Sequence, residues 1–307
     1  MPAIVLLLSL AVPAAACLNY YGKNLKGDVV ETDSERADPT KLLRELTLHP
    51  EHDDIKKLDL GPEPDPRADF KVRNDYAASL VRQGKAKRAI EILESIEQFH
   101  PGEYMVASNL GTAYELNGDV ARAHHWIAEG MKRYPDVHQQ TEWLHLRILE
   151  VKRELAKDPN WLQTRSVLDF DFGNEVVPKL PPVWGKMGEE RVLQALRYQL
   201  HERLAFVSPP EPIVGELIGV YADYAALKWP VEYVIPLYDL ALSFKPTRSE
   251  LLEKRRERAM ELRPPPSPIP EIQAVGDWGV IAVVLLGITL ATLVAHRKLR
   301  GQPAPRS

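Results

Sequence analysis

The sequence predicts an all-α protein: a short solenoid of helical hairpins with an irregular insertion, followed by one C-terminal transmembrane helix. Three observations lead to this prediction. Small residues, glycines and prolines recur at a fixed interval, apolar residues repeat at helical spacing, and a long uncharged apolar run stands near the C-terminus. The composition agrees with a folded chain, since 45% of the 307 residues are hydrophobic and 27% are charged.

Composition and motifs exclude several classes of function. The formal net charge of −4 provides no basic surface for nucleic acid, so no nucleic-acid partner is expected. A single cysteine excludes an intramolecular disulfide framework and any multi-cysteine metal centre. The sequence shows no phosphate-binding glycine loop, nucleophile elbow or HExxH motif. We therefore expect no enzyme activity, and we assign no catalytic, cofactor-binding or metal-binding residue.

The N-terminus carries an export signal. The apolar run Ala3–Val12 is too short to span a bilayer and is followed by the small residues 14–16, so we expect residues 1–16 to be a signal peptide. The next residue, Cys17, is the lone cysteine of the chain. This layout resembles a bacterial lipoprotein signal, although Ala14 stands where leucine is usual. Two interpretations stay open: lipid attachment at Cys17, or a cysteine behind an ordinary signal-peptidase site.

The C-terminus carries a predicted membrane anchor. Residues 278–295 contain no charge and, as a helix, reach about 27 Å. The basic tail 296–307 places that end in the cytoplasm and the bulk of the chain outside it, while the proline-rich residues 263–277 form a stalk. We expect a single-pass protein of the bacterial inner membrane with its bulk in the periplasm. Alternatively, Ile269-Pro270 and the following Asp277-Trp278-Gly279 resemble C-terminal sorting signals that deliver proteins to the cell surface.

Residues 68–136 contain two units in which matching residues lie 34 positions apart. Small residues at the matching sites let two helices approach closely, glycines end the first helix of each unit, and prolines stop the second. The matching pairs are Ala77 and Gly111, Gly84 and Gly118, Ala89 and Ala123, and Pro101 and Pro135. The period and the residue types predict two successive helical hairpins.

These units resemble the tetratricopeptide repeat, a helix–turn–helix unit of the same length. In the second unit Leu110-Gly111, Tyr114 and Gly118 stand on the family pattern, whereas Ala107 and Gly130 depart from it. The resemblance implies a solenoid whose first helices line a concave groove for a peptide or another protein. On this basis the candidate groove residues are Asn74, Ser108 and Thr112. The alternative interpretation of these positions is an ordinary solvated helix face.

The remaining segments are assigned by pattern. Residues 17–67 are expected to be an irregular, extended or turn-rich lead. Residues 137–212 hold amphipathic helices at 142–156 and 191–207 with a loop insertion between them. Residues 213–262 are expected to form a degenerate third repeat and a charged capping helix.

The predicted function is that of a membrane-anchored scaffold or adaptor that binds a protein or peptide of the cell envelope. One alternative is a fixed structural subunit of an envelope complex. A second alternative is a metal-dependent or other enzyme that uses the insertion at 137–212. A pocket that joins Asp169, Asp171, His138 and His145 would favour the second alternative.

Overall fold

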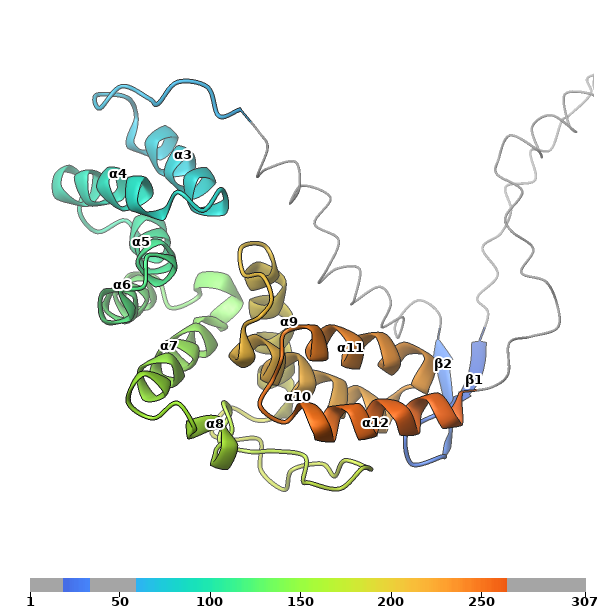
Figure 1. The fold of residues 1–307 in the computed structure, drawn as a ribbon. Helices are drawn as coiled ribbons and strands as arrows, with labels where there is room; N and C mark the ends of the chain where they lie inside the picture. Colours follow the sequence, from blue (N-terminus) through green and yellow to red (C-terminus); the bar gives the residue numbers. More distant parts are fainter. Residues whose placement is uncertain (1–18, 34–58, 264–307) are drawn as a thin grey trace, which may run out of the picture. The chain divides into compact units, whose positions relative to one another are not determined.

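The computed structural model describes residues 19–33 and 59–263, and these are predominantly helical (Figure 1). The helices are α3 Phe70–Arg82, α4 Ala86–Phe99, α5 Tyr104–Leu116, α6 Val120–Arg133, α7 Glu142–Lys157, α8 Trp161–Thr164, α9 Glu189–Leu204, α10 Pro212–Lys228, α11 Val231–Ser243 and α12 Ser249–Leu262. A 3-10 turn, Val137–Gln140, precedes α7. The prediction of a mostly helical protein is confirmed for this part of the chain.

The predicted export and anchor signals lie outside the described residues. This applies to the signal peptide at 1–16, to Cys17, and to the segments expected as stalk, membrane helix and tail from residue 264 onward. Within residues 19–33 and 59–263, no helix is both long enough and apolar enough to cross a bilayer.

Both hairpins of the 34-residue units turn in the same way. Gly84 and Gly118 follow the first helix of each unit and have φ angles of +74° and +84°, which favour glycine over any residue with a Cβ. The next residue then donates its N–H to the carbonyl five positions earlier, at 2.8 Å from Lys85 and 2.9 Å from Asp119. This pair of features is the Schellman helix ending. Equal spacing in the sequence thus produces equal turns.

Small residues bring the helices of each hairpin together. Ala77, Ala89 and Ala123 are completely buried. At Gly111 of α5 the approach of α6 is closer still, because a Cβ placed there would lie 2.4 Å from the Cδ1 atom of Ile127. The prolines of the pattern, Pro101 and Pro135, each stand two residues beyond the end of a second helix, α4 and α6 respectively. Tyr114 is buried, and its hydroxyl contacts Glu94 and Arg122.

Two hydrophobic cores meet at α7. The first core is formed by α3–α6 and includes Leu149 of α7. The second core is formed by α7–α12 with the insertion, and it includes Leu144, Ile148 and Val151 of α7. All four side chains are fully buried. The predicted amphipathic helix at 142–156 therefore has apolar residues on more than one face, and α7 joins the two cores.

The segment predicted as a degenerate repeat forms the hairpin α10–α11, with α12 beside it. Ala222, Tyr238 and Ala241 are fully buried between these helices. Arg255 of α12 is also fully buried and forms an ion pair of 2.6 Å with Asp223 of α10. The same guanidinium donates to the carbonyl oxygens of residues 173 and 175, at 2.6 and 2.9 Å. The capping helix thus also holds the middle of the insertion loop, which runs from α7 to α9.

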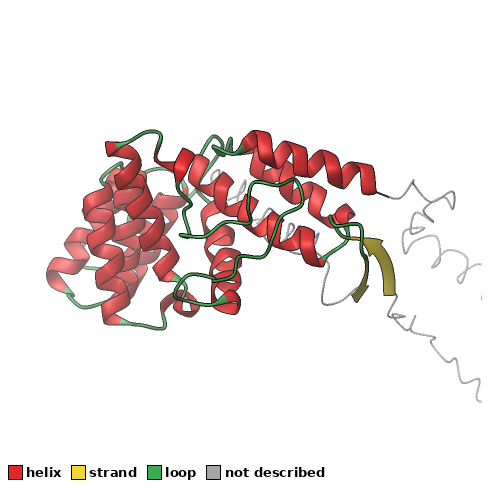
Figure 2. Ribbon diagram, turned by 90° about the horizontal axis from the view of Figure 1, so that it is seen from below, coloured by secondary structure: helices red, strands yellow, loops and turns green. Residues whose placement is uncertain are grey.

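The lead segment contains a β-hairpin that the sequence analysis did not predict. Strands β1 Asn19–Lys23 and β2 Val29–Asp33 pair antiparallel (Figure 2). Their turn docks on the end of α10, where Leu25 is fully buried and donates its N–H to the carbonyl of Ala226 at 2.8 Å. Gly22 packs against Pro230, because an added Cβ would come within 2.5 Å of that ring. This long-range docking has no local signature in the sequence.

The insertion differs from its predicted form in detail. Helix α9 begins at Glu189 and ends at Leu204, whereas the periodicity predicted 191–207. Gly188, with a φ angle of +80°, is the residue that precedes α9. The loop between α7 and α9 also contains the short helix α8. Periodicity locates a helix face well but does not locate its ends.

The close approach at Gly111 can be tested by a double-mutant cycle. Gly111→Ala should lower the free energy of unfolding by about 1–3 kcal/mol, because the new methyl group overlaps Ile127. Ile127→Ala removes the overlapping atoms and leaves a cavity of its own. The double variant should be less destabilised than the sum of the two single variants in urea unfolding. Additive effects would contradict the proposed contact.

Candidate functional site

The first helices of the hairpins line a polar cleft of about 180 Å³, which we call the inner cleft. Its lining residues come from α3, α5, the 3-10 turn before α7, α7 itself, and the C-terminal end of α9 with the residues after it. Its polar lining side chains are Arg82, Asn109, Thr112, His138, Glu142, His145, Gln199, Glu202 and Arg203. Residues 82 and 206 of the lining are far apart in the chain, so the cleft depends on the tertiary structure.

Two lining residues of the cleft, His145 and Arg203, contact the carboxylate of Glu115, whose side chain is 1% exposed. Arg203 of α9 binds it with both terminal nitrogens, at 2.9 and 3.1 Å. His145 and Lys152 of α7 each approach it at 2.7 Å. Burial alone raises the pKa of Glu115, but these three cationic groups outweigh burial and hold that pKa well below its usual range. The carboxylate of Glu115 on α5 is thus bound by side chains of both α7 and α9.

A second buried carboxylate, that of Glu142, adjoins the first. It accepts hydrogen bonds from Gln199 of α9 at 2.9 Å and from the His138 ring at 3.1 Å, and His145 lies 3.5 Å away. Burial raises the pKa of Glu142, but the two histidines lower it further than burial raises it. Burial lowers the pKa of both histidines, yet the neighbouring carboxylates give each a net rise. The carboxylates therefore favour the protonated form of both histidines.

The three predicted groove residues have different positions. Thr112 lines the inner cleft. Asn74 is buried, and its side-chain oxygen accepts a hydrogen bond of 2.9 Å from Asn109, which does line the cleft. Ser108 instead lies against α6, since a Cβ added at Gly130 would come within 2.8 Å of its hydroxyl oxygen. Ser108 therefore faces the second helix of its own hairpin and is not among the residues that line the inner cleft.

The sequence analysis did not select Glu115 or Arg203, which form a buried ion pair beside the cleft. These two residues are 88 positions apart, so no short motif contains both. The available signal was weak: a glutamate in α5 beside the buried Tyr114, and an arginine in the mostly apolar buried stripe of α9. Buried charges of this kind require partners, but the sequence does not name the partner.

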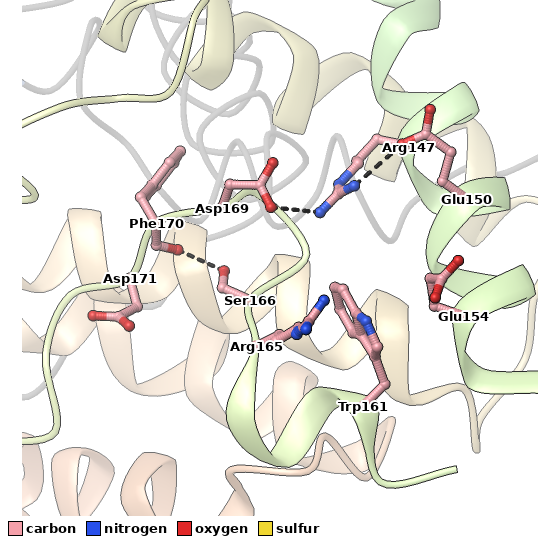
Figure 3. A pocket seen from close by; sticks show the side chains of 9 residues that line it. All are labelled: Arg147, Glu150, Glu154, Trp161, Arg165, Ser166, Asp169, Phe170 and Asp171. Carbon is pink, nitrogen blue, oxygen red and sulfur yellow. Dashed lines mark hydrogen bonds and ion pairs between the residues drawn. The ribbon is translucent and has the colours of Figure 1, made fainter. Parts of the chain in front are cut away.

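A second hollow lies on another face of α7, and we call it the insertion groove. Its first part, of about 560 Å³, is lined by α7, α8 and the loop that follows them (Figure 3). Arg147 crosses this part and pairs with Asp169 at 2.6 Å and Glu150 at 3.1 Å. An adjoining part of about 460 Å³ shares Arg147, Glu150, Asp169 and Phe170 and is otherwise mostly apolar. The two parts therefore form one groove.

The four residues proposed for an enzymatic site do not come together. Asp169 and Asp171 line the insertion groove, whereas His138 and His145 line the inner cleft. In the part of the chain that the structure describes, no group of three or more His, Cys, Asp or Glu side chains could hold a metal ion.

No family model matches the chain. No curated protein matches it either. The functional argument therefore rests on the fold and on the two sites.

The Glu115–Arg203 contact predicts a large effect of one substitution. Arg203→Ala should lower the free energy of unfolding by about 3–5 kcal/mol, because it leaves a buried carboxylate short of its main counter-charge. Arg191→Ala, on an exposed face of the same helix, is the matched control and should change it by less than about 0.5 kcal/mol. If the two substitutions lowered the free energy of unfolding equally in urea, the buried pair would not be the source of the predicted effect.

The histidine–carboxylate pairs predict the pH dependence of stability. The folded-state pKa of both histidines is raised above the ordinary value of 6.5. The contribution of the two histidines to the free energy of unfolding is thus complete below about pH 6.5, and it is lost as the pH rises through their raised pKa values. The carboxylates have lowered pKa values, so their contribution is lost in acid, below about pH 4.5. Urea unfolding across this range should show a weaker alkaline decline for His145→Gln, and an unchanged decline would refute the assignment.

Proposed function

We propose that the chain is a membrane-anchored protein-interaction module of the tetratricopeptide-repeat type, held on the outer side of a bacterial membrane. The repeat assignment is supported by the two hairpins α3–α4 and α5–α6, which share glycine-ended first helices and buried small residues at the same spacing. The membrane anchor and the export signal remain proposals drawn from the sequence at 278–295 and 1–16. Binding breaks and forms no covalent bond.

One observation carries the proposal: the inner face of the hairpins already receives a helix. The end of α9 lies against α5 and α7, where Arg203 reaches Glu115 and Gln199 reaches Glu142. A face that accommodates an amphipathic helix of its own chain has the shape and the polar groups for helix-in-groove recognition. The open remainder of the inner cleft, beside Arg82, Asn109 and Thr112, is the proposed place for a partner segment.

The alternative function, a fixed structural subunit, is favoured by a different observation. Three large apolar side chains are exposed where α4 and α6 end and α5 begins: Phe99 is 69% exposed, Met105 54% and Tyr134 44%. Their helices meet at this end, where the rings of Tyr104 and Tyr134 are 4.8 Å apart. An exposed apolar patch is typical of a surface that is covered in an assembly. A permanent neighbour would bind there, outside the inner cleft.

Site-specific photocrosslinking in intact cells separates the two functions. A benzoylphenylalanine at position 112 of the full-length chain, in the inner cleft, should capture a defined envelope protein or peptide. The same probe at position 87, exposed on α4, is the matched control and should not capture it. Capture only at position 105 with a fixed stoichiometry would favour the structural subunit. A probe at position 112 that reacts with no partner would refute the interaction module.

A further inference from the structure

We propose that the insertion groove binds an extended polypeptide segment that carries a lysine or arginine next to apolar side chains. This site is separate from the inner cleft, because the two share no lining residue. Helix α7 contributes to both: Glu142 and His145 belong to the cleft, while Trp143, Arg147 and Glu150 belong to the groove.

The groove has two arms of different chemistry. The apolar arm is lined by Trp143, Leu146, Leu168, Trp184 and Met187. The polar arm is lined by Glu154, Trp161, Arg165 and Asp171 (Figure 3). Arg147 and Phe170 stand in the wall that both arms share. A single small cation would occupy only one arm, whereas an extended chain with an apolar and a basic side chain spans both.

Charge in the polar arm favours a cationic side chain. Four carboxylates line it, from Glu150, Glu154, Asp169 and Asp171, against two guanidinium groups. The guanidinium of Arg147 is already engaged within the protein, with two of these carboxylates and with the carbonyl oxygen of residue 167 at 2.6 Å. The carboxylate of Glu154 is paired with Lys157 at 2.7 Å. Four carboxylates against two arginines and this lysine leave the polar arm one net negative charge, and within the described part of the chain the exposed carboxylate of Asp171 accepts only a backbone N–H, that of Gly173. This remaining charge attracts a lysine or arginine and disfavours an acidic partner.

The buried indole of Trp161 supplies an independent observation. This side chain is 6% exposed, and its Nε1–H donor has no acceptor among the described residues. A buried donor without an acceptor is costly to fold, and a peptide carbonyl would satisfy it. The guanidinium groups of Arg147 and Arg165 lie 5.8 and 5.7 Å from the indole ring. Because Arg165 is exposed, it can move aside for a ligand at little cost.

The loop that forms the groove is held in place before any ligand binds. Phe172 is fully buried and packs edge-to-face against Trp184, with 5.6 Å between the ring centroids. Arg255 of α12 donates to the carbonyl oxygens of residues 173 and 175 and is itself paired with Asp223. A groove that is already formed loses little entropy when it binds a peptide.

The test is a positional-scanning library of fluorescent decapeptides, applied to the purified full-length chain. We expect enrichment of lysine or arginine, together with leucine, proline or an aromatic residue. The best peptide should bind the double variant Glu154→Gln/Asp171→Asn about 3- to 10-fold more weakly. The control Glu253→Gln/Glu257→Gln, which removes the same charge from exposed positions of α12, should leave the affinity unchanged.

Two further measurements complete the test. Trp161→Phe keeps an aromatic ring and removes the N–H donor, so it should weaken binding while far-UV circular dichroism stays that of the wild type. Spermidine, a small polycation, should bind more weakly than the peptide because it leaves the apolar arm empty. Enrichment of aspartate or glutamate, no enrichment at any position, equal affinity for the groove and control variants, or spermidine binding as tight as the peptide would each overturn the proposal. None of these outcomes affects crosslinking at position 112.

Discussion

The buried carboxylate of Glu115 is the constraint on which the arrangement of the helices depends. It stands on α5, in the repeat hairpins, and its counter-charges stand on α7 and α9. Burial of an isolated carboxylate costs several kcal/mol, so these helices must lie where Arg203, His145 and Lys152 can reach it. The two hydrophobic cores could pack in several ways, because apolar contact has no direction. The ion cluster selects one of them.

This cluster limits geometry more than it adds stability. A buried ion pair is often no better than an apolar pair of the same volume, but it tolerates far less displacement. A shift of α9 along the inner face by one turn would separate Arg203 from Glu115 and Gln199 from Glu142. The inner cleft therefore keeps a defined shape beside Thr112, which a binding surface requires.

Helix α7 connects the two proposed binding surfaces. Its buried residues join both cores, one of its faces carries the histidine–carboxylate pairs, and another carries Arg147 and Trp143 of the insertion groove. Residues three or four apart on a helix share a face, whereas adjacent residues point in different directions. Neighbouring positions of α7 therefore belong to different binding surfaces. Helix α7 is followed by the four-residue helix α8 and a long loop rather than by a second long helix. The loop in its place is what creates the groove.

Much of the local structure follows from the sequence alone. The two hairpins could be predicted from the interval of 34 residues, from the small residues at 77, 89, 111 and 123, and from the glycines at 84 and 118. This was possible because close helix approach and a left-handed turn each demand particular residue types. Helical periodicity likewise located α7 and α9 to within a few residues. The tertiary structure alone decided the rest. Four features join residues that are distant in the chain. They are the docking of the β-hairpin on α10, the position of Ser108 against α6, the contact of Arg203 with Glu115 and the shape of the insertion groove. Their energies depend on burial and on which charges meet, and no local pattern of residues encodes either.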